Sequence, residues 1–387
     1  MKIDKRNWEK VKFGDVCSLV NENTKNAKED GLEYNIGLEH ITPTDLHIRS
    51  WNTTDIDTTF TRIFRKGQVL FGRRRAYQRK VAYAEFDGIC SGDIMVFQAK
   101  EDKLLPKLLP FIVQSDGFFQ QAVDTSAGSL SPRTKFTDLA NYEFLLPPKE
   151  EQTRLAELLW AADEVVEKEK QVKDKLDASR KSLMKDLFFK IEEKKRLSEL
   201  NIKEINGLWK TDEIDKTIDV NIIRSTEFSD YGKIDFSKLS TLPVKKSQYK
   251  SRKLFPNDII LERSGGGPDQ PVGRVCFFER ETGEYSFSNF TSCLRVNSNS
   301  VVLPKYLFYF LQYFWEMKGT DRIQNQTTGI RNLDYDLYKR IKIPVCKKDT
   351  QVKVISQIDD IHNIIEKSIV NSIGAQLLKS SLINQIF

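Results

Sequence analysis

The stretch EQTRLAELLWAADEVVEKEKQVKDKLDASRKSLMKDLF, residues 151–188, has a second copy near the other end of the chain. A shift of 199 residues, from 151 to 350, places it without a gap on TQVKVISQIDDIHNIIEKSIVNSIGAQLLKSSLINQIF, residues 350–387. Gln152 then falls on Gln351, and Phe188 falls on Phe387. The apolar pattern agrees better than the individual letters do, so the chain carries two copies of one element.

Both copies show the alternating three- and four-residue apolar spacing of a helix that buries a narrow seam. Neither contains proline, and the only glycine is Gly374, so each can form an unbroken helix of about 50 Å at about 1.5 Å per residue. The pattern predicts that the two helices pack as an antiparallel coiled coil; two unrelated surface helices are the alternative. The predicted seam comprises Leu155, Leu158, Ala162, Val165, Val172, Leu176, Leu183 and Leu187, and then Ile358, Ile361, Ile364, Ile365, Ile369, Ile373, Leu378, Leu382 and Ile386.

Length and composition limit the class of protein. A chain of 387 residues can hold two or three domains, each with its own core. The longest apolar runs, such as residues 306–315, are too short to cross a bilayer, and MKIDKRNWEK is too charged for a secretion signal. We therefore expect a soluble, cytoplasmic protein. The five scattered cysteines and three histidines disfavour a zinc site, while the net charge of +6 permits a polyanionic partner without requiring one.

The residues before each helix contain the same parts in the same order. Short strand-like runs such as GQVLFGR and DIMVFQA are followed by a predicted helix, residues 104–124, and by a closing strand, YEFLLPP. In the second half PNDIILERS matches KGQVLFGRR, PKYLFYFLQY matches PKLLPFIVQS, and QTTGIRNLDYDLYKRIKIPV matches SAGSLSPRTKFTDLANYEFLLP. The charged segment KIEEKKRLSEL, after Phe188, is predicted to be a linker or a frayed helix end.

This order predicts an α+β fold with an internal pseudo-two-fold repeat. Two similar mixed α/β globular domains are separated by two long antiparallel helices, with predicted boundaries at 1–149, 150–190, 191–346 and 347–387. Because each domain precedes its own helix, antiparallel packing would hold the domains at opposite ends of a rod. Such a rod would fix the distance between two sites.

Motifs for catalysis are absent from the sequence. It contains no GxxxxGK[ST], no GxSxG, no HExxH and no Asn/Asp-Pro-Pro-aromatic tetrapeptide, and the glycine-rich SGGGPDQPVGR lacks the lysine of a phosphate-binding loop. No cluster of carboxylates stands out as a metal site. The sequence therefore disfavours an enzyme that acts alone, and we assign no catalytic or metal-binding residue.

A basic segment, RRRAYQRK, follows a strand-like run in the first half. Arginine can pair with phosphate or with guanine, and glutamine can pair with adenine, so such side chains on a strand-end loop favour DNA binding. A solvated basic turn is the alternative. The candidates here are Arg73, Arg74, Arg75, Tyr77, Gln78, Arg79 and Lys80.

Three other loops carry candidates of mixed hydrogen-bonding type. In the second half, glycines flanked by arginines would let backbone approach DNA closely, although a hairpin without a ligand has the same composition. The loops before the two closing strands are polar, which turn chemistry explains equally well. The candidates are Arg263, Ser264, Gly265, Gly266, Gln270 and Arg274; Ser126, Ser129, Ser131, Arg133 and Lys135; and Gln324, Asn325, Gln326, Thr328, Arg331 and Asn332. The aromatic runs at 118–119 and 306–315 are predicted to be core.

Taken together, these motifs resemble the specificity subunit of type I restriction-modification enzymes. The resemblance spans nearly the whole chain and rests on WEKVKFGDV, SGGGPDQPVGRV, TTGIRNLDYDLYKRIKIPV and LLPPKEEQTRLAELL, together with the duplication. The first half departs from the pattern, because it has TSAGSLSPR where the second half keeps a TTGxxN form at residues 327–332. It is therefore open whether Ser131 and Pro132 take the role of Asn332.

The resemblance implies a role for each part. Each globular half would be a target recognition domain that reads one half of a bipartite, asymmetric DNA sequence, and the helices would set the spacer and dock two methylation subunits. Those subunits would bind S-adenosylmethionine and methylate an adenine in each half-site; a restriction subunit would add ATP- and Mg-dependent cleavage. This chain would itself be non-catalytic and hold no cofactor. The other hypotheses are a coiled-coil adaptor that binds proteins and a self-sufficient endonuclease.

Overall fold

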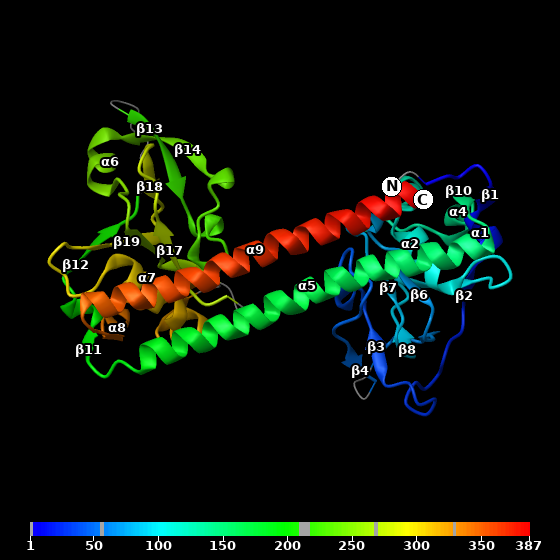
Figure 1. The fold of residues 1–387 in the computed structure, drawn as a ribbon, viewed down its shortest axis with the longest axis horizontal. Coiled ribbons are helices and arrows are strands. Elements are labelled where there is room, and N and C mark those ends of the chain that lie inside the picture. The colour runs from blue at the N-terminus through cyan, green and yellow to red at the C-terminus, as the bar shows by residue number, and fades with distance from the viewer. Residues whose placement is uncertain (1–2, 55–57, 209–216, 267–269, 328–329) are drawn as a thin grey trace. The chain divides into compact units, whose positions relative to one another are not determined.

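The computed structural model describes residues 3–54, 58–208, 217–266, 270–327 and 330–387 (Figure 1). The chain forms two compact units. Unit 1 comprises Met1–Gln171 and Val370–Phe387, and unit 2 comprises Val172–Ile369. Within the described residues, no helix is both long and apolar enough to span a membrane.

The globular part of unit 1 is built on two four-stranded sheets. One is antiparallel, in the order β2-β9-β6-β7, and its inner face carries buried residues such as Phe71 and Phe97. The other has the order β4-β3-β8-β5 and is mixed, because β3 and β8 run parallel. This confirms the prediction of mixed sheets. The strands are β2 (Cys17–Val20), β3 (Tyr34–Ile36), β4 (Asn52–Thr53), β5 (Arg62–Phe64), β6 (Val69–Gly72), β7 (Val81–Tyr83), β8 (Gly88–Cys90) and β9 (Ile94–Ala99).

Short helices cover the antiparallel sheet of unit 1. The single helix predicted for residues 104–124 is in fact broken into a 3-10 turn at Pro106–Leu108, α2 (Leu109–Gln114) and α3 (Asp116–Asp124). The break occurs because Ser115 is extended and caps α3, its hydroxyl accepting from Phe118 N at 3.3 Å. Phe118 and Phe119 lie in the core, as predicted. The remaining elements are α1 (Phe13–Val16), α4 (Phe136–Leu139), and β1 (Glu9–Lys12) paired with β10 (Glu143–Leu146).

Unit 2 repeats this topology. Its antiparallel sheet has the order β12-β19-β15-β17, its second sheet has the order β14-β13-β18 with β13 parallel to β18, and β11 pairs with β22 as β1 pairs with β10. The segment after Phe188, predicted to be a linker, thus contains a strand, because the second half needs its own counterpart of β1. The strands are β11 (Lys194–Arg196), β12 (Ile202–Asn206), β13 (Thr217–Ile223), β14 (Ser240–Lys245), β15 (Asp258–Glu262), β17 (Val275–Phe278), β18 (Tyr285–Phe287), β19 (Thr291–Val296) and β22 (Lys342–Pro344).

The described residues of unit 2 also form three α-helices besides α5 and α9, and one small sheet. The helix α7 carries the aromatic run, whose Tyr306 is fully buried. The small sheet has the order β16-β21-β20. These elements are α6 (Lys246–Arg252), α7 (Pro304–Glu316), α8 (Tyr335–Tyr338), β16 (Ser264–Gly266), β20 (Gln324–Thr327) and β21 (Ile330–Leu333).

Both long helices form, as α5 (Lys149–Phe189) and α9 (Lys348–Ile386). In unit 1, Leu155 and Leu159 near the start of α5 share a core with Ile383 and Ile386 at the end of α9. In unit 2 the roles are exchanged, because Met184 and Phe188 of α5 share a core with Val354 and Ile358 of α9. The helices are therefore antiparallel in each unit, and each core is completed by the last turns of the helix that follows the other globular half.

The repeat extends to individual hydrogen bonds. The buried side chain of Gln152 accepts from Leu105 N at 2.8 Å and donates to the carbonyls of Lys103 and Pro147. Gln351 does the same with Leu303 N, at 2.7 Å, and with the carbonyls of Val301 and Cys346. Each glutamine joins the start of a long helix to the loop that precedes α2 or α7.

The predicted seam is correct at residues such as Leu155, Ile358, Ile365 and Ile386 and wrong at five others. These five are between 45% and 59% exposed. The heptad interpretation assumed that every seam residue is buried against the partner helix, whereas burial also depends on whether a globular domain packs over the helix. There the buried stripe includes polar residues such as Asp163 and Arg180. The exposed residues are Val165, Val172, Ile364, Ile373 and Leu378.

Candidate nucleic-acid interface

In unit 1 two of the predicted loops meet around Asp93. Arg133 Nε lies 2.7 Å from Asp93 Oδ1, and Arg74 reaches the other carboxylate oxygen at 3.4 Å. Arg74 also donates to Ser131 Oγ at 3.2 Å, and Arg75 N donates to the carbonyl of Pro132 at 2.8 Å. Burial pushes the pKa of Asp93 upward, but the hydrogen bond from Arg133 and the nearby positive charges outweigh it and lower the pKa. The carboxylate therefore stays charged and organises the cluster.

The cluster presents a tyrosine to solvent. Tyr77 lies in a 3-10 turn, Ala76–Gln78, between Arg75 and Arg79, which both have left-handed backbone with φ of 53° and 55°. This turn leaves Tyr77 58% exposed beside the arginines. An exposed aromatic ring among cations suits contact with nucleic acid.

Two cations of the same segment, predicted to contact DNA, instead contact other residues of unit 1. Arg79 donates to the carbonyl of Gln114 at 3.0 Å, pairs with Asp116 at 2.6 Å, and lies 4.6 Å from the centre of the Phe119 ring. Lys80 Nζ donates to the carbonyl of Leu38 at 2.6 Å. The sequence shows their charge but not these partners. The structure therefore does not bring them into the exposed cluster with Arg74.

The remaining candidates of unit 1 differ in their surroundings. Ser126 Oγ donates to the carbonyl of Ala122 at 2.7 Å, directly after the end of α3. Ser129 and Lys135 are exposed, and Gln78 is half-buried. Arg133 stands where the second half has Asn332. Thr134 N donates to the carbonyl of Arg73 after β6, and Leu333 N donates in the same way to the carbonyl of Arg263 after β15, so the residues before them are equivalent. The position of Asn332, for which the sequence left Ser131 and Pro132 open, is therefore occupied in unit 1 by Arg133.

In unit 2 the small sheet brings the other loop candidates together. Ser264 pairs with Asn332 across β16 and β21, and its hydroxyl donates to Asn332 Oδ1 at 2.6 Å. Asn325 lies opposite Asn332 on β20. The register also places Arg331 opposite Gly266 and Gln326, and Gln324 opposite Leu333. Thr328 lies outside the described residues.

Three further candidates of unit 2 have partners or constraints within their own domain. Arg263 pairs with Glu204 at 2.5 Å and lies 4.0 Å from the centre of the Tyr335 ring. Gly265 has φ of +109°, which favours glycine. At Gly266 a Cβ atom would lie 2.5 Å from the carbonyl oxygen of Gln270, so this glycine allows the chain to approach itself.

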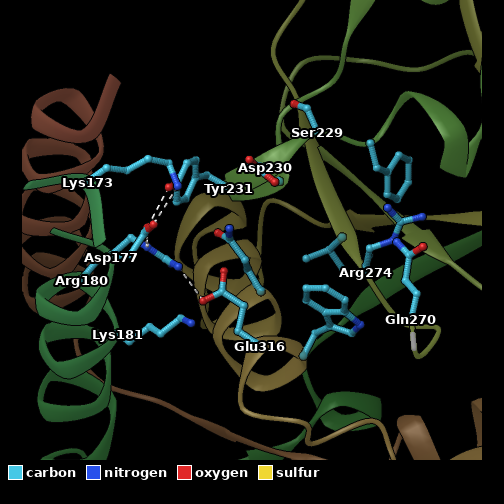
Figure 2. A pocket seen from close by; sticks show the side chains of 15 residues that line it. Lys173, Asp177, Arg180, Lys181, Ser229, Asp230, Tyr231, Gln270, Arg274 and Glu316 are labelled. Carbon is cyan, nitrogen blue, oxygen red and sulfur yellow. Dashed lines mark hydrogen bonds and ion pairs between the residues drawn. The ribbon is translucent and has the colours of Figure 1, made fainter. Parts of the chain in front are cut away.

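Gln270 and Arg274 line a cleft of about 390 Å³ together with residues of α5 that sequence reasoning missed (Figure 2). Arg274 binds the buried carboxylate of Glu262 through two hydrogen bonds, of 2.9 and 2.8 Å. The sequence analysis gave no role to the cations of α5, and only the contacts of the folded chain place them here. The α5 residues at the cleft are Lys173, Asp177, Arg180 and Lys181.

The buried arginine of α5 fixes one wall of this cleft. Arg180 Nη2 donates to Glu316 at 2.7 Å, and its guanidinium lies 5.1 Å from the centre of the Tyr231 ring (Figure 2). The Tyr231 hydroxyl donates to Asp177 at 2.7 Å. Burial, and then this carboxylate, raises the pKa of Tyr231, so the hydroxyl remains a donor at neutral pH.

Comparison with known proteins assigns both halves of the chain to the same family. The family described as "Type I restriction modification DNA specificity domain" matches residues 5–178 and again residues 193–375. A curated relative, the type I restriction enzyme EcoDI specificity subunit from Escherichia coli, is 26% identical over 175 residues, which are 42% of this chain and 37% of that protein. The chain thus spans well under half the length of that relative in the alignment.

Two solved structures share the fold. The S subunit of a type I restriction-modification system from M. genitalium matches with a TM-score of 0.55 and 14% identity, over 100% of this chain and 98% of that one. A chain from a study of complex assembly and conformational transition of the type I R-M system matches with a TM-score of 0.60 and 16% identity, over 98% and 97%.

The fold is a duplication of one mixed α/β domain with its long helix, and each copy matches the same DNA specificity domain family. The chain belongs to the family of type I restriction modification DNA specificity domains, as a specificity subunit that carries two of them.

Proposed function

We propose that each globular half reads one half of a bipartite, asymmetric DNA target. The observation that carries this proposal is that the two halves share one scaffold but differ in the loops at equivalent positions. Where unit 1 has Arg74 and Arg133, unit 2 has Ser264 and Asn332. Arginine and asparagine prefer different base edges, so different half-sequences follow. Phosphate contacts would supply salt-dependent affinity, and base contacts would discriminate between sequences.

The long helices would set the distance between the half-sites and dock partner subunits. Large apolar side chains outside the buried ends of the helices are solvent-exposed, among them Val165, Ile364, Val370 and Leu377. Val370, Ile373 and Leu377 lie at positions i, i+3 and i+7 of α9 and so share one exposed face, and an apolar face of this kind favours a protein partner. Because the repeat presents its surface twice, two methylation subunits fit, each with S-adenosylmethionine. A restriction subunit with ATP and Mg would complete a cleaving complex, and we place the assembly in the cytoplasm.

Methylation mapping of whole genomes tests this proposal directly. Cells that carry the gene, together with its methylation subunit, should show methylated adenines in two unlike half-sequences separated by a fixed unspecified spacer. Deletion of this gene alone should abolish the methylated motif. A palindromic motif in the wild-type strain would contradict the assignment of different half-sites to the two units.

A further inference from the structure

A loop of unit 1 holds a large apolar side chain in solvent beside the predicted DNA contacts. Leu130 is 87% exposed, the largest exposed fraction of any large apolar side chain among the described residues. It lies in the loop of residues 128–132, which is closed because Ala127 and Arg133 exchange two main-chain hydrogen bonds, of 3.1 and 2.9 Å. A single exposed leucine is ordinary on a protein surface, so its support and its neighbours decide what it does.

The loop that carries Leu130 is fastened to the basic segment after β6. Arg75 N donates to the carbonyl of Pro132 at 2.8 Å, and the Arg74 side chain donates to Ser131 Oγ at 3.2 Å. Pro132 also restricts the backbone of the residue before it. The fold therefore presents the leucine from a fixed position, and little conformational entropy is lost when the side chain enters a partner.

The charges around Leu130 match a duplex better than an apolar protein surface. In the part of the chain that the structure describes, Asp93 is the only carboxylate paired with Arg74 and Arg133, and none pairs with Arg75. An apolar protein surface would desolvate this excess positive charge without supplying an anion. DNA offers phosphates to the arginines and a base stack to the leucine.

Unit 2 has an exposed apolar side chain at the equivalent hairpin. The last pair of β20 and β21 before the turn is Thr327 with Ile330, and Ile330 is 47% exposed. This hairpin lies beside the strand of Ser264, as the loop of unit 1 lies beside Arg74. Two loops of different sequence thus share one property, a large apolar side chain at the turn next to candidate DNA contacts.

We propose that Leu130 inserts between two stacked base pairs of the half-site that unit 1 reads, and that Ile330 does the same in unit 2. Apolar wedges of this kind enter through the minor groove, partly unstack one base step and bend the duplex, while neighbouring arginines bind the flanking phosphates. Pyrimidine–purine steps unstack most easily, so a TA or CA/TG step is expected at the insertion point. The inference rests on the proposed function, since it needs each unit on its own half-site.

A fluorescent base analogue tests the insertion, because aminopurine becomes brighter when it loses a stacking neighbour. The probe is a duplex that carries the motif found by methylation mapping, with aminopurine placed in turn at each position of both half-sites except the methylated adenines. The full chain in complex with its methylation subunit should brighten one further position in each half-site severalfold. Leu130→Ala should abolish the brightening in one half-site and weaken binding about tenfold. Leu130→Met, which keeps the apolar volume, should behave as the wild type.

Matched variants separate insertion from other roles of the leucine. Ile330→Ala should abolish the brightening in the other half-site only. Val123→Ala, which shortens an exposed apolar side chain of α3 outside the loop, should match the wild type in both half-sites. Size-exclusion chromatography shows whether each variant keeps its methylation subunit. Loss of that subunit from Leu130→Ala would assign the leucine to a protein contact and overturn the proposal.

The remaining outcomes distinguish this inference from the proposed function. Binding of the motif duplex by the wild type without brightening outside the methylated adenines, or equal brightening by Leu130→Ala, would sink the insertion alone. A methylated motif without two unlike half-sequences would sink both.

Discussion

At the scale of single residues, unit 1 contains a charged network that responds to pH. His47 Nε2 lies 2.9 Å from Asp163, which also pairs with buried Lys379. The hydrogen bond to Asp163, opposed by burial, raises the pKa of His47 from 6.5 to about 9. Because the folded pKa is higher than the unfolded one, the protonated histidine stabilises the fold fully below about pH 6.5, and this contribution disappears as the pH rises through about 9.

We therefore expect the free energy of unfolding to fall by roughly 1 kcal/mol between about pH 6 and pH 9.5, a figure reduced for the partial exposure of His47. Urea titrations at the two pH values measure it, and His47→Gln should flatten the difference. An undiminished difference in that variant would assign the effect to other groups. His362, at the repeat position of Asp163, gives the opposite response: burial, then Arg180, lowers its pKa to about 4, so its contribution disappears on acidification.

The partly exposed arginines Arg74 and Arg75 of unit 1 give a second prediction at this scale. Replacing Arg74 and Arg75 with alanine should weaken DNA binding and reduce the slope of log affinity against log salt by roughly one unit for each phosphate that is no longer neutralised. Filter-binding at several salt concentrations measures the slope. Arg154→Ala, at an exposed position on α5 outside the loop, serves as the control. An unchanged slope in the double variant would show that neither arginine touches phosphate.

The candidate site could be predicted from the sequence only in part. The loops were recognisable because cations and amides gather at strand ends, and the structure does bring Arg74, Ser131 and Arg133 together. Sequence does not show which cation has an internal partner, so Arg263 was counted with the others although it pairs with Glu204. Lys181 was missed because the sequence of a long helix does not distinguish a lysine that lines a cleft from one on the solvent-exposed face.

At the scale of elements, the long helices test the idea of a molecular ruler. Insertion of four residues next to Lys173, about one turn and about 6 Å, should lengthen or shift the spacer and keep both half-sequences. Methylation mapping of the variant gives the answer. The same insertion in the exposed turn at residues 281–283, between β17 and β18, should leave the spacer unchanged. A normal spacer after the helix insertion would exclude α5 as the ruler.

Elements with a strong hydrophobic periodicity could be predicted from the sequence, and elements that depend on tertiary contacts could not. The helix period and the shift from 151 to 350 predicted α5 and α9. The break at Ser115 depends on a side-chain cap, and β11 forms because β22 offers it an antiparallel edge. Exposure of Val165 and Ile364 could not be seen in the apolar pattern, because the pattern does not say where along a helix a domain packs.

At the scale of the whole molecule, each core depends on the helix that follows the other globular half. Deletion of residues 370–387 would remove Ile383 and Ile386 from the core of unit 1 and leave Asp163 without Lys379. We expect unit 1 to be destabilised by several kcal/mol, since each large core truncation alone costs about 2–5 kcal/mol. Hydrogen exchange should show faster exchange in β6 and β9 and unchanged protection in β15 and β19.

A substitution in the exposed part of α9 is the control for this deletion. Ile364→Ser changes an apolar residue that is already half in solvent, so exchange in both units should match the wild type. If the deletion instead weakened only unit 2, the sharing of helix ends between the halves would not describe the folded protein in solution.

The hydrogen bonds of Gln152 and Gln351 bear on how the gene for this protein can evolve by recombination. Each holds its domain through main-chain atoms, two carbonyls and one amide N–H. Every residue has a main-chain carbonyl, and every residue except proline has an amide N–H, so a different recognition domain with the same loop shape can bind the same glutamine after a single genetic crossover. A lineage can thereby acquire a new DNA specificity by exchanging a gene segment, while the helix and the glutamine that receive the new domain remain unchanged.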